Sequence, residues 1–242
     1  THPSVQVETF QFDILEDHGR LTDVIACSDL VIGATDSEAS KRLINQICWS
    51  LSVPAVYGAA YDRAFGGDVV RIIPPETPCY ECFYAQVVEL FETSPKKGNL
   101  DYTSADLSKV VAEPGLGMDV GFITLILTKM ALLTLLRGTE STLEDFPTNW
   151  IMWGNRPVWA FEKPLESIFL EFEKNPQCSV CQTPDVKRKQ TMKALGMTED
   201  EYQQALECLA EELSEVPTLT SEVILRRNCQ QSDGTEIIND KE

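Results

Sequence analysis

Four of the eight cysteines form two C-x-x-C pairs, Cys79/Cys82 and Cys178/Cys181. A C-x-x-C turn brings two thiolates to one ion, and two such turns complete the tetrahedral shell that zinc prefers. Because four sulfur ligands leave no open position on the metal, such a site is structural rather than catalytic. Redox pairs and a coincidental spacing are the alternatives. We predict a structural zinc on these four cysteines, which would join the middle of the chain to a segment near its end.

A carboxylate at the end of a short apolar run is the second candidate for chemistry. Residues 29–36 read Asp-Leu-Val-Ile-Gly-Ala-Thr-Asp, which is typical of a buried parallel strand that ends in small and acidic residues. Ligands bind at the carboxyl ends of parallel strands, so a carboxylate at this position could have a function there. Asp36 could also simply cap the next helix. The residues alone favour the cap.

The segments around Asp36 alternate as strand, helix and strand. Apolar residues at helical spacing predict a helix over 38–51 with Ser37 as its N-cap, and the run 53–58 predicts the following strand. This order indicates a doubly wound α/β sheet. An edge strand within the first 20 residues is expected from their alternation, and three further strands are expected at 68–73, 150–153 and 157–172, the last two as an antiparallel pair.

The remaining segments are a long apolar helix, a long loop and an acidic tail. Asp119 and Lys129 interrupt the apolar stretch 118–136, so we interpret it as a buried core helix rather than a membrane span, which needs roughly 20 mostly apolar residues. Residues 91–115 predict a loop. Residues 198–242 hold 12 acidic and 3 basic side chains, a net charge of −9, and open with a capped acidic helix over 198–213.

Charge and composition limit the class of function. The formal net charge of −18 argues against binding nucleic acid or an anionic membrane, because both need clustered positive charge. The two histidines, His2 and His18, exclude a histidine-rich metal site. The N-terminus shows no basic region followed by an apolar run. We therefore expect a cytoplasmic protein whose cysteines are thiols or metal ligands rather than disulfides.

Taken in order, these motifs resemble the ThiF/MoeB-like adenylyltransferase family, which includes molybdopterin-synthase and thiamine-biosynthesis enzymes and the ubiquitin-activating enzymes. The resemblance covers roughly residues 1–183 and implies an α/β fold, with a Rossmann-like, partly parallel sheet, an antiparallel extension and a structural zinc site. Residues 184–242 would be an acidic helical extension. The motifs that carry the resemblance are Asp-Leu-Val-Ile-Gly-Ala-Thr-Asp-Ser at 29–37, Lys41 and Asn45, Pro54 with Gly58, Pro78-Cys79-Tyr80-Glu81-Cys82, and Cys178-x-x-Cys181.

The resemblance implies ATP-dependent adenylation of the C-terminal carboxylate of a ubiquitin-like or sulfur-carrier protein, carried out by a homo- or hetero-oligomer. In that family the aspartate that corresponds to Asp36 helps to hold magnesium and the triphosphate, which makes it the catalytic candidate. Lys41 and Asn45 would also bind the cofactor. Zinc would be structural, whereas ATP and magnesium would be bound during the reaction.

Three departures from the family pattern qualify this expectation. The chain has no G-x-G-x-x-G and starts where the family's third strand would begin, so the nucleotide-binding front half is expected to be missing. Lys41 stands where the family usually has arginine, which keeps the charge but loses the bidentate fork. Residues 83–117 contain no cysteine for a thioester step. We expect adenylation alone or assistance to another subunit, and the alternative is a non-catalytic, zinc-stabilised interaction module.

Overall fold

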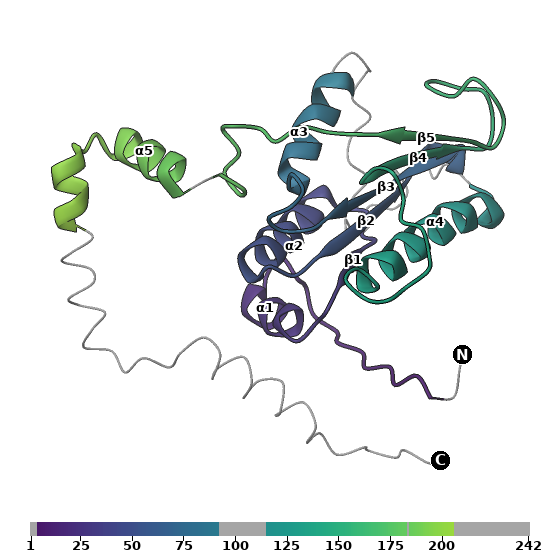
Figure 1. Ribbon diagram of the computed structural model, residues 1–242, viewed down its shortest axis with the longest axis horizontal. Helices are drawn as coiled ribbons and strands as arrows, with labels where there is room; N and C mark the ends of the chain where they lie inside the picture. Colours follow the sequence, from purple (N-terminus) through teal and green to yellow (C-terminus); the bar gives the residue numbers. More distant parts are fainter. Residues whose placement is uncertain (1–3, 92–114, 183, 206–242) are drawn as a thin grey trace, which may run out of the picture.

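A five-stranded mixed sheet organises the part of the chain that the computed structural model describes, which comprises residues 4–91, 115–182 and 184–205 (Figure 1). Helices lie before, between and after the strands. In chain order the elements are α1 (His18–Ala26), β1 (Val31–Gly33), α2 (Glu38–Leu51), β2 (Ala55–Ala60), the 3-10 turn η1 (Asp62–Ala64), β3 (Gly66–Ile72), α3 (Tyr80–Phe91), α4 (Gly117–Leu135), β4 (Trp150–Gly154), β5 (Glu166–Leu170) and α5 (Pro184–Leu195).

The strands follow one another across the sheet in the order β1-β2-β3-β4-β5. β1 and β2 are parallel, with Val31 opposite Ala55, because the crossover helix α2 returns the chain to the same end of the sheet. All later pairs are antiparallel; the short η1 connection, for example, reverses the chain between β2 and β3. The mixed α/β class, with a parallel part and an antiparallel extension, is therefore confirmed.

Each face of the sheet is covered by a different set of helices. Side chains alternate along β2 and β3, so Val56 and Val69 point to α4 while Tyr57 and Val70 point to the helices α1, α2 and α3. Gly58 faces α4, where an added Cβ would lie 2.5 Å from Leu127 Cδ1. The absence of a side chain at Gly58 therefore allows α4 to pack closely against β2.

Helix α4 only partly matches the buried core helix predicted from its apolar sequence. Ile123, Leu127 and Met130 are buried against the sheet, whereas Phe122 and Leu125 are exposed. One sheet can cover only one side of a helix that is apolar all round. Among the described residues α4 is the one helix whose length and composition would allow it to cross a membrane.

The N-terminal prediction is wrong. Residues 5–12 form no strand, and the first element is α1, which is capped where the Asp17 carboxylate accepts a hydrogen bond from Arg20 N–H at 3.1 Å. The Arg20 guanidinium lies over the rings of Phe10 and Phe12, at 5.7 and 4.9 Å from their centres. Alternation of apolar and polar residues does not make a strand when no partner strand pairs with it.

Helix boundaries elsewhere follow the sequence in part. The helix predicted at 38–51 is confirmed as α2, and the Ser37 hydroxyl accepts a hydrogen bond from Ser40 N–H at 3.3 Å. The expected loop at 91–115 and the expected helix at 198–213 fall largely outside the described residues. The described beginning of that helix carries the expected cap, in which Thr198 N–H donates to Glu201 Oε2 at 2.7 Å.

Candidate functional site

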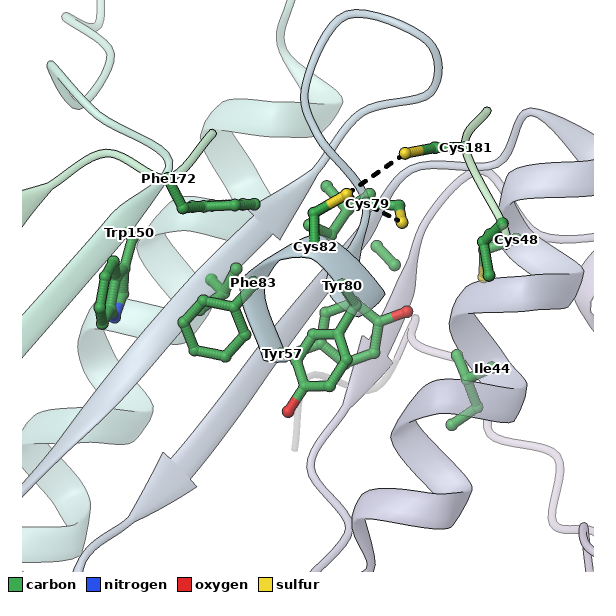
Figure 2. Close-up of a cluster of buried hydrophobic side chains, with 14 of the residues drawn as sticks. Ile44, Cys48, Tyr57, Cys79, Tyr80, Cys82, Phe83, Trp150, Phe172 and Cys181 are labelled. Atoms are coloured by element: carbon green, nitrogen blue, oxygen red, sulfur yellow. Dashed lines mark hydrogen bonds between the residues drawn. The ribbon is translucent and has the colours of Figure 1, made fainter. Parts of the chain in front are cut away.

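The two C-x-x-C pairs meet on the face of the sheet that α1, α2 and α3 cover. Cys79 directly precedes α3, and its carbonyl accepts hydrogen bonds from the N–H groups of Cys82 and Phe83 at 3.0 and 3.2 Å. The second pair lies in turns beyond β5, where Cys178 N–H donates to Asn175 O at 3.0 Å. All four cysteines are buried, and their sulfur atoms lie within 4.8 Å of one another. Figure 2 labels three of them, Cys79, Cys82 and Cys181.

The spacing of the sulfur atoms fits a single tetrahedral ion. Cys79 Sγ lies 3.4 Å from Cys178 Sγ and 3.9 Å from Cys82 Sγ, and Cys82 Sγ lies 3.4 Å from Cys181 Sγ. Zinc–sulfur bonds of about 2.3 Å place the corners of a tetrahedron about 3.8 Å apart. The donor set is the soft thiolate set that suits zinc. The predicted ligands Cys79, Cys82, Cys178 and Cys181 therefore form one cluster that could hold zinc.

Backbone N–H groups donate hydrogen bonds to two of the four sulfur atoms. Asn175 N–H donates to Cys82 Sγ at 3.3 Å, and Val180 N–H donates to Cys178 Sγ at 3.4 Å. The pKa of Cys82 is lowered to about 5, chiefly by the hydrogen bond from the Cys79 thiol, while the same bond raises the pKa of Cys79. Burial raises the pKa of Cys181 to about 11. A bound cation would take up all four sulfurs as thiolates.

The cysteines outside the cluster differ from one another. Cys48 is a free, buried thiol on α2, and burial raises its pKa to about 12, so it is an inert core residue. Cys27 lies directly after α1, at the C-cap of that helix. Cys208 and Cys229 lie outside the described residues.

A pocket of about 380 Å³ lies at the carboxyl ends of β1 and β2, between the start of α2 and helix α4. Asp36 lines it from the loop that joins β1 to α2, and its carboxylate is exposed. Ser37 caps α2, so Asp36 is not needed for that purpose. The pocket is lined by Ala34, Thr35, Asp36, Glu38, Lys41, Gly58, Ala59, Ala60, Val120, Ile123, Thr124 and Leu127.

Lys41 is the cation of this pocket among the described lining residues. Its side chain is only 3% exposed, and its Nζ donates to Glu38 Oε1 at 3.1 Å. A buried ammonium needs such a partner, because an uncompensated charge in the protein interior is costly. Lys41 also acts on Asp68 of β3, where its positive charge opposes the effect of burial on the carboxyl pKa.

Asp68 was not predicted as a site residue from the sequence. Burial raises its pKa to about 7, and the Tyr61 hydroxyl donates a hydrogen bond to its carboxylate. Asp68 stands between Gly66-Gly67 and the buried apolar pair Val69-Val70 of β3, and an acid directly before such a pair is the signal that could have drawn attention to it. It adds a second carboxylate near Lys41, on the sheet beneath α2.

The structure separates Asn45 from the other two predicted cofactor-binding residues. Asp36 and Lys41 both line the pocket, whereas Asn45 is 1% exposed and does not line it. Its Oδ1 accepts a hydrogen bond from Tyr80 N–H at 3.0 Å, at the first turn of α3. Asn45 therefore stabilises the segment that carries Cys79 and Cys82.

The fold and the site together define a mixed α/β protein that has a pocket at the end of its parallel strands and a four-cysteine cluster. The sequence profile of the ThiF family matches residues 1–180, and the chain belongs to this family. The match and the cluster therefore agree with the resemblance seen in the sequence.

Individual relatives match a shorter region of the chain than the family profile does. The SAMP-activating enzyme E1 of Haloferax volcanii is 32% identical over 88 residues, which make up 36% of this chain and 31% of that protein. The sulfur carrier protein ThiS adenylyltransferase of Escherichia coli is 31% identical over 84 residues, or 34% of this chain and 32% of that protein. The match thus spans about a third of the length of these relatives. Among solved structures, E. coli MccB has a TM-score of 0.41 and 17% identity, covering 64% of this chain and 40% of that chain.

Proposed function

We propose that this chain is part of an ATP-dependent adenylyltransferase that activates the C-terminal carboxylate of a ubiquitin-like or sulfur-carrier protein. The observation that carries the proposal is the meeting of Asp36 and Lys41 in one pocket at the carboxyl ends of β1 and β2. Membership of the ThiF family and relatives named as adenylyltransferases or activating enzymes support the class of reaction.

Asp36 and Lys41 would have different roles in the reaction, because their side chains carry opposite charges. Asp36 would hold Mg²⁺, which supplies neutralisation of phosphate charge when it is bound. Lys41 would place a positive charge beside the phosphate that the carrier's carboxylate attacks, with pyrophosphate as the leaving group. Gly58, Ala59 and Ala60 line the pocket beside these two residues. Catalysis of this kind works by positioning and by charge stabilisation.

Other parts of the complete assembly would supply the rest of the ATP site. Among the described lining residues the pocket holds one cation, Lys41, against the several negative charges of a triphosphate. A longer chain or a second subunit would provide the Gly-rich turn and further cations. In this proposal residues 1–183 form the adenylyltransferase-type domain, residues 184–242 form an acidic extension, and the protein acts in the cytoplasm as a homo- or hetero-oligomer.

The four-cysteine cluster has a structural role in this proposal. A zinc ion bound by Cys79, Cys82, Cys178 and Cys181 would tie the start of α3 to the turns after β5. Its contribution would be to folding rather than to chemistry, because no coordination position remains open.

A second function, a zinc-stabilised interaction module without catalysis, is favoured by the presence of one cation, Lys41, among the described residues that line the pocket. ATP–pyrophosphate exchange separates the two functions. The full-length protein that contains this chain, incubated with a candidate carrier, should exchange label between pyrophosphate and ATP, and Asp36→Ala should abolish the exchange while zinc content stays unchanged. Asp29→Ala, at an exposed acid before β1, is the matched control and should keep activity. Absence of exchange in the unmodified full-length protein would leave the interaction module as the function.

A further inference from the structure

Side chains of α2 hold the first turn of α3 at two neighbouring positions. Tyr80 N–H donates to the Asn45 side chain, and the Glu81 carboxylate accepts two hydrogen bonds from Arg42, at 2.7 Å to Nε and 2.6 Å to Nη2. Both positions follow Cys79 of the cysteine cluster directly. The position of α3 relative to α2 is thus fixed where the cluster is built.

The Tyr80 side chain continues this connection toward the pocket. It is buried between the rings of Tyr57 and Phe83, at centroid distances of 4.4 and 5.3 Å (Figure 2). Its hydroxyl donates to Glu38 Oε2 at 2.9 Å. Burial raises the pKa of Tyr80, so the hydroxyl keeps its proton at neutral pH.

Glu38 connects Tyr80 to Lys41 through its two oxygen atoms. Oε2 accepts from the Tyr80 hydroxyl, and Oε1 accepts from Lys41 Nζ at 3.1 Å. The Glu38 side chain is 36% exposed and lies in the first turn of α2, so it could rotate toward water if nothing held it. The Tyr80 hydroxyl restricts that freedom, because it binds one carboxylate oxygen while the other accepts from Lys41.

We propose that Tyr80 is a positioning residue, whose hydroxyl holds Glu38 in place and thereby fixes the Lys41 ammonium at the pocket. The proposal deepens the function proposed above, since it concerns the cation that would face phosphate. Loss of a hydrogen bond to a charged group changes an equilibrium by roughly 10- to 100-fold. Without the hydroxyl, the ammonium is expected to spend much of its time out of its buried position.

Amine labelling of Lys41 tests this inference without any nucleotide. The full-length protein, with its metal, is treated with limiting acetic anhydride, and the modification of Lys41 is measured by peptide mass spectrometry. Tyr80→Phe keeps the ring contacts and removes the hydroxyl, and we expect Lys41 to react roughly tenfold faster or more. Tyr57→Phe is the matched control, because the buried Tyr57 hydroxyl has no hydrogen-bond partner among the described residues, and it should leave the rate unchanged.

A second variant tests whether Tyr80 acts through Glu38. Glu38→Ala should also expose Lys41, and adding Tyr80→Phe to it should produce no further increase, because the carboxylate that links them is gone. An unchanged labelling rate in Tyr80→Phe or in Glu38→Ala overturns the proposal, and so does a Tyr80→Phe protein that loses its zinc or its fold.

Binding of Mg·ATP to the same full-length variants separates this inference from the proposed function. If the unmodified protein binds Mg·ATP, Tyr80→Phe should raise its dissociation constant by roughly tenfold while Tyr57→Phe leaves it unchanged. An unmodified protein that binds no Mg·ATP contradicts the proposed function alone, because the labelling result does not depend on nucleotide. Binding of Mg·ATP by Tyr80→Phe at the unmodified affinity contradicts the positioning role alone.

Discussion

Replacing Asp68 by Asn should remove a pH dependence from the stability of this protein. Asp68 lies on β3 beside the Tyr61 hydroxyl, and burial raises its pKa from 3.8 to about 7. The folded protein therefore holds a proton on Asp68 between about pH 4 and pH 7, a range in which the unfolded chain has lost it. Asn keeps an oxygen that can accept the hydrogen bond from Tyr61 and never carries the charge.

The sign and size of the effect follow from proton linkage. Because the folded state binds more protons than the unfolded state across this range, the free energy of unfolding decreases as pH rises from about 4 to about 7. The full effect of such a rise in pKa is at most roughly 4 kcal/mol, at about 1.4 kcal/mol per pKa unit. Between pH 5 and pH 8 we expect the unmodified protein to lose roughly 2 to 3 kcal/mol relative to Asp68→Asn.

Urea unfolding at pH 5, 6, 7 and 8, followed by tryptophan fluorescence, measures this difference. The gap in free energy of unfolding between Asp68→Asn and the unmodified protein should widen with pH up to about 7 and then level off. Asp29→Asn, at an exposed position, is the control for loss of one negative charge and should show a gap that does not change with pH. A gap for Asp68→Asn that is equal at pH 5 and pH 8 would refute the reasoning.

Two further pairs of substitutions, each with its own control, test the cluster and the sheet. Cys178→Ser should reduce the zinc measured by mass spectrometry from one ion per chain to a small fraction and lower the melting temperature, whereas Cys48→Ala should keep the ion; equal zinc in both variants would argue against the cluster as the site. Gly33→Ala should lower the free energy of unfolding by about 1–3 kcal/mol, because its Cβ would lie 2.5 Å from Tyr57 Cδ1. Gly121→Ala in α4 has no atom within 4 Å of the new Cβ and should raise the free energy of unfolding by about 0.5–1 kcal/mol. If Gly121→Ala lost as much stability as Gly33→Ala, the steric explanation would be contradicted.

Local signals in the sequence were sufficient for the features that depend on neighbours along the chain. The apolar spacing over 38–51 and the Ser37 cap predicted α2 correctly, since a helix start is decided within a few residues. The two C-x-x-C pairs predicted the cysteine cluster, because each turn already brings two sulfurs together. The position of Asp36 at the end of a predicted parallel strand indicated that it lies at a ligand crevice, and it does line the pocket.

Features decided by distant residues were missed. Helix α3 was not predicted, and its start is held by Asn45, which lies 35 residues earlier in the chain. The same contact directs Asn45 away from the pocket, although the sequence placed it one turn after Lys41 on the same helix. Asp68 becomes important only because β3 pairs with β2 beneath α2, a register that no local pattern specifies.

Which side chains of α4 are exposed also depends on residues that are distant in the sequence. Its sequence is apolar on all sides, and hydropathy alone cannot tell which side meets the sheet. Glycines at positions 58 and 67 mark the side that meets the sheet, because they let Leu127 and Ile123 approach β2 and β3 closely, while Leu125 remains exposed.

The separation of the two cysteine pairs along the chain affects how the protein is made. Cys79 and Cys178 lie 99 residues apart. Bringing them together closes a long loop of the chain, which is a slow step that comes late in folding. At a translation rate of about 5–20 residues per second, roughly 5–20 s pass between synthesis of the first pair and synthesis of the second. During that interval the nascent chain presents two thiols without their partners. A messenger truncated before Cys178 would leave every copy permanently in this state, so the four-cysteine cluster forms only when the C-terminal segment is completed.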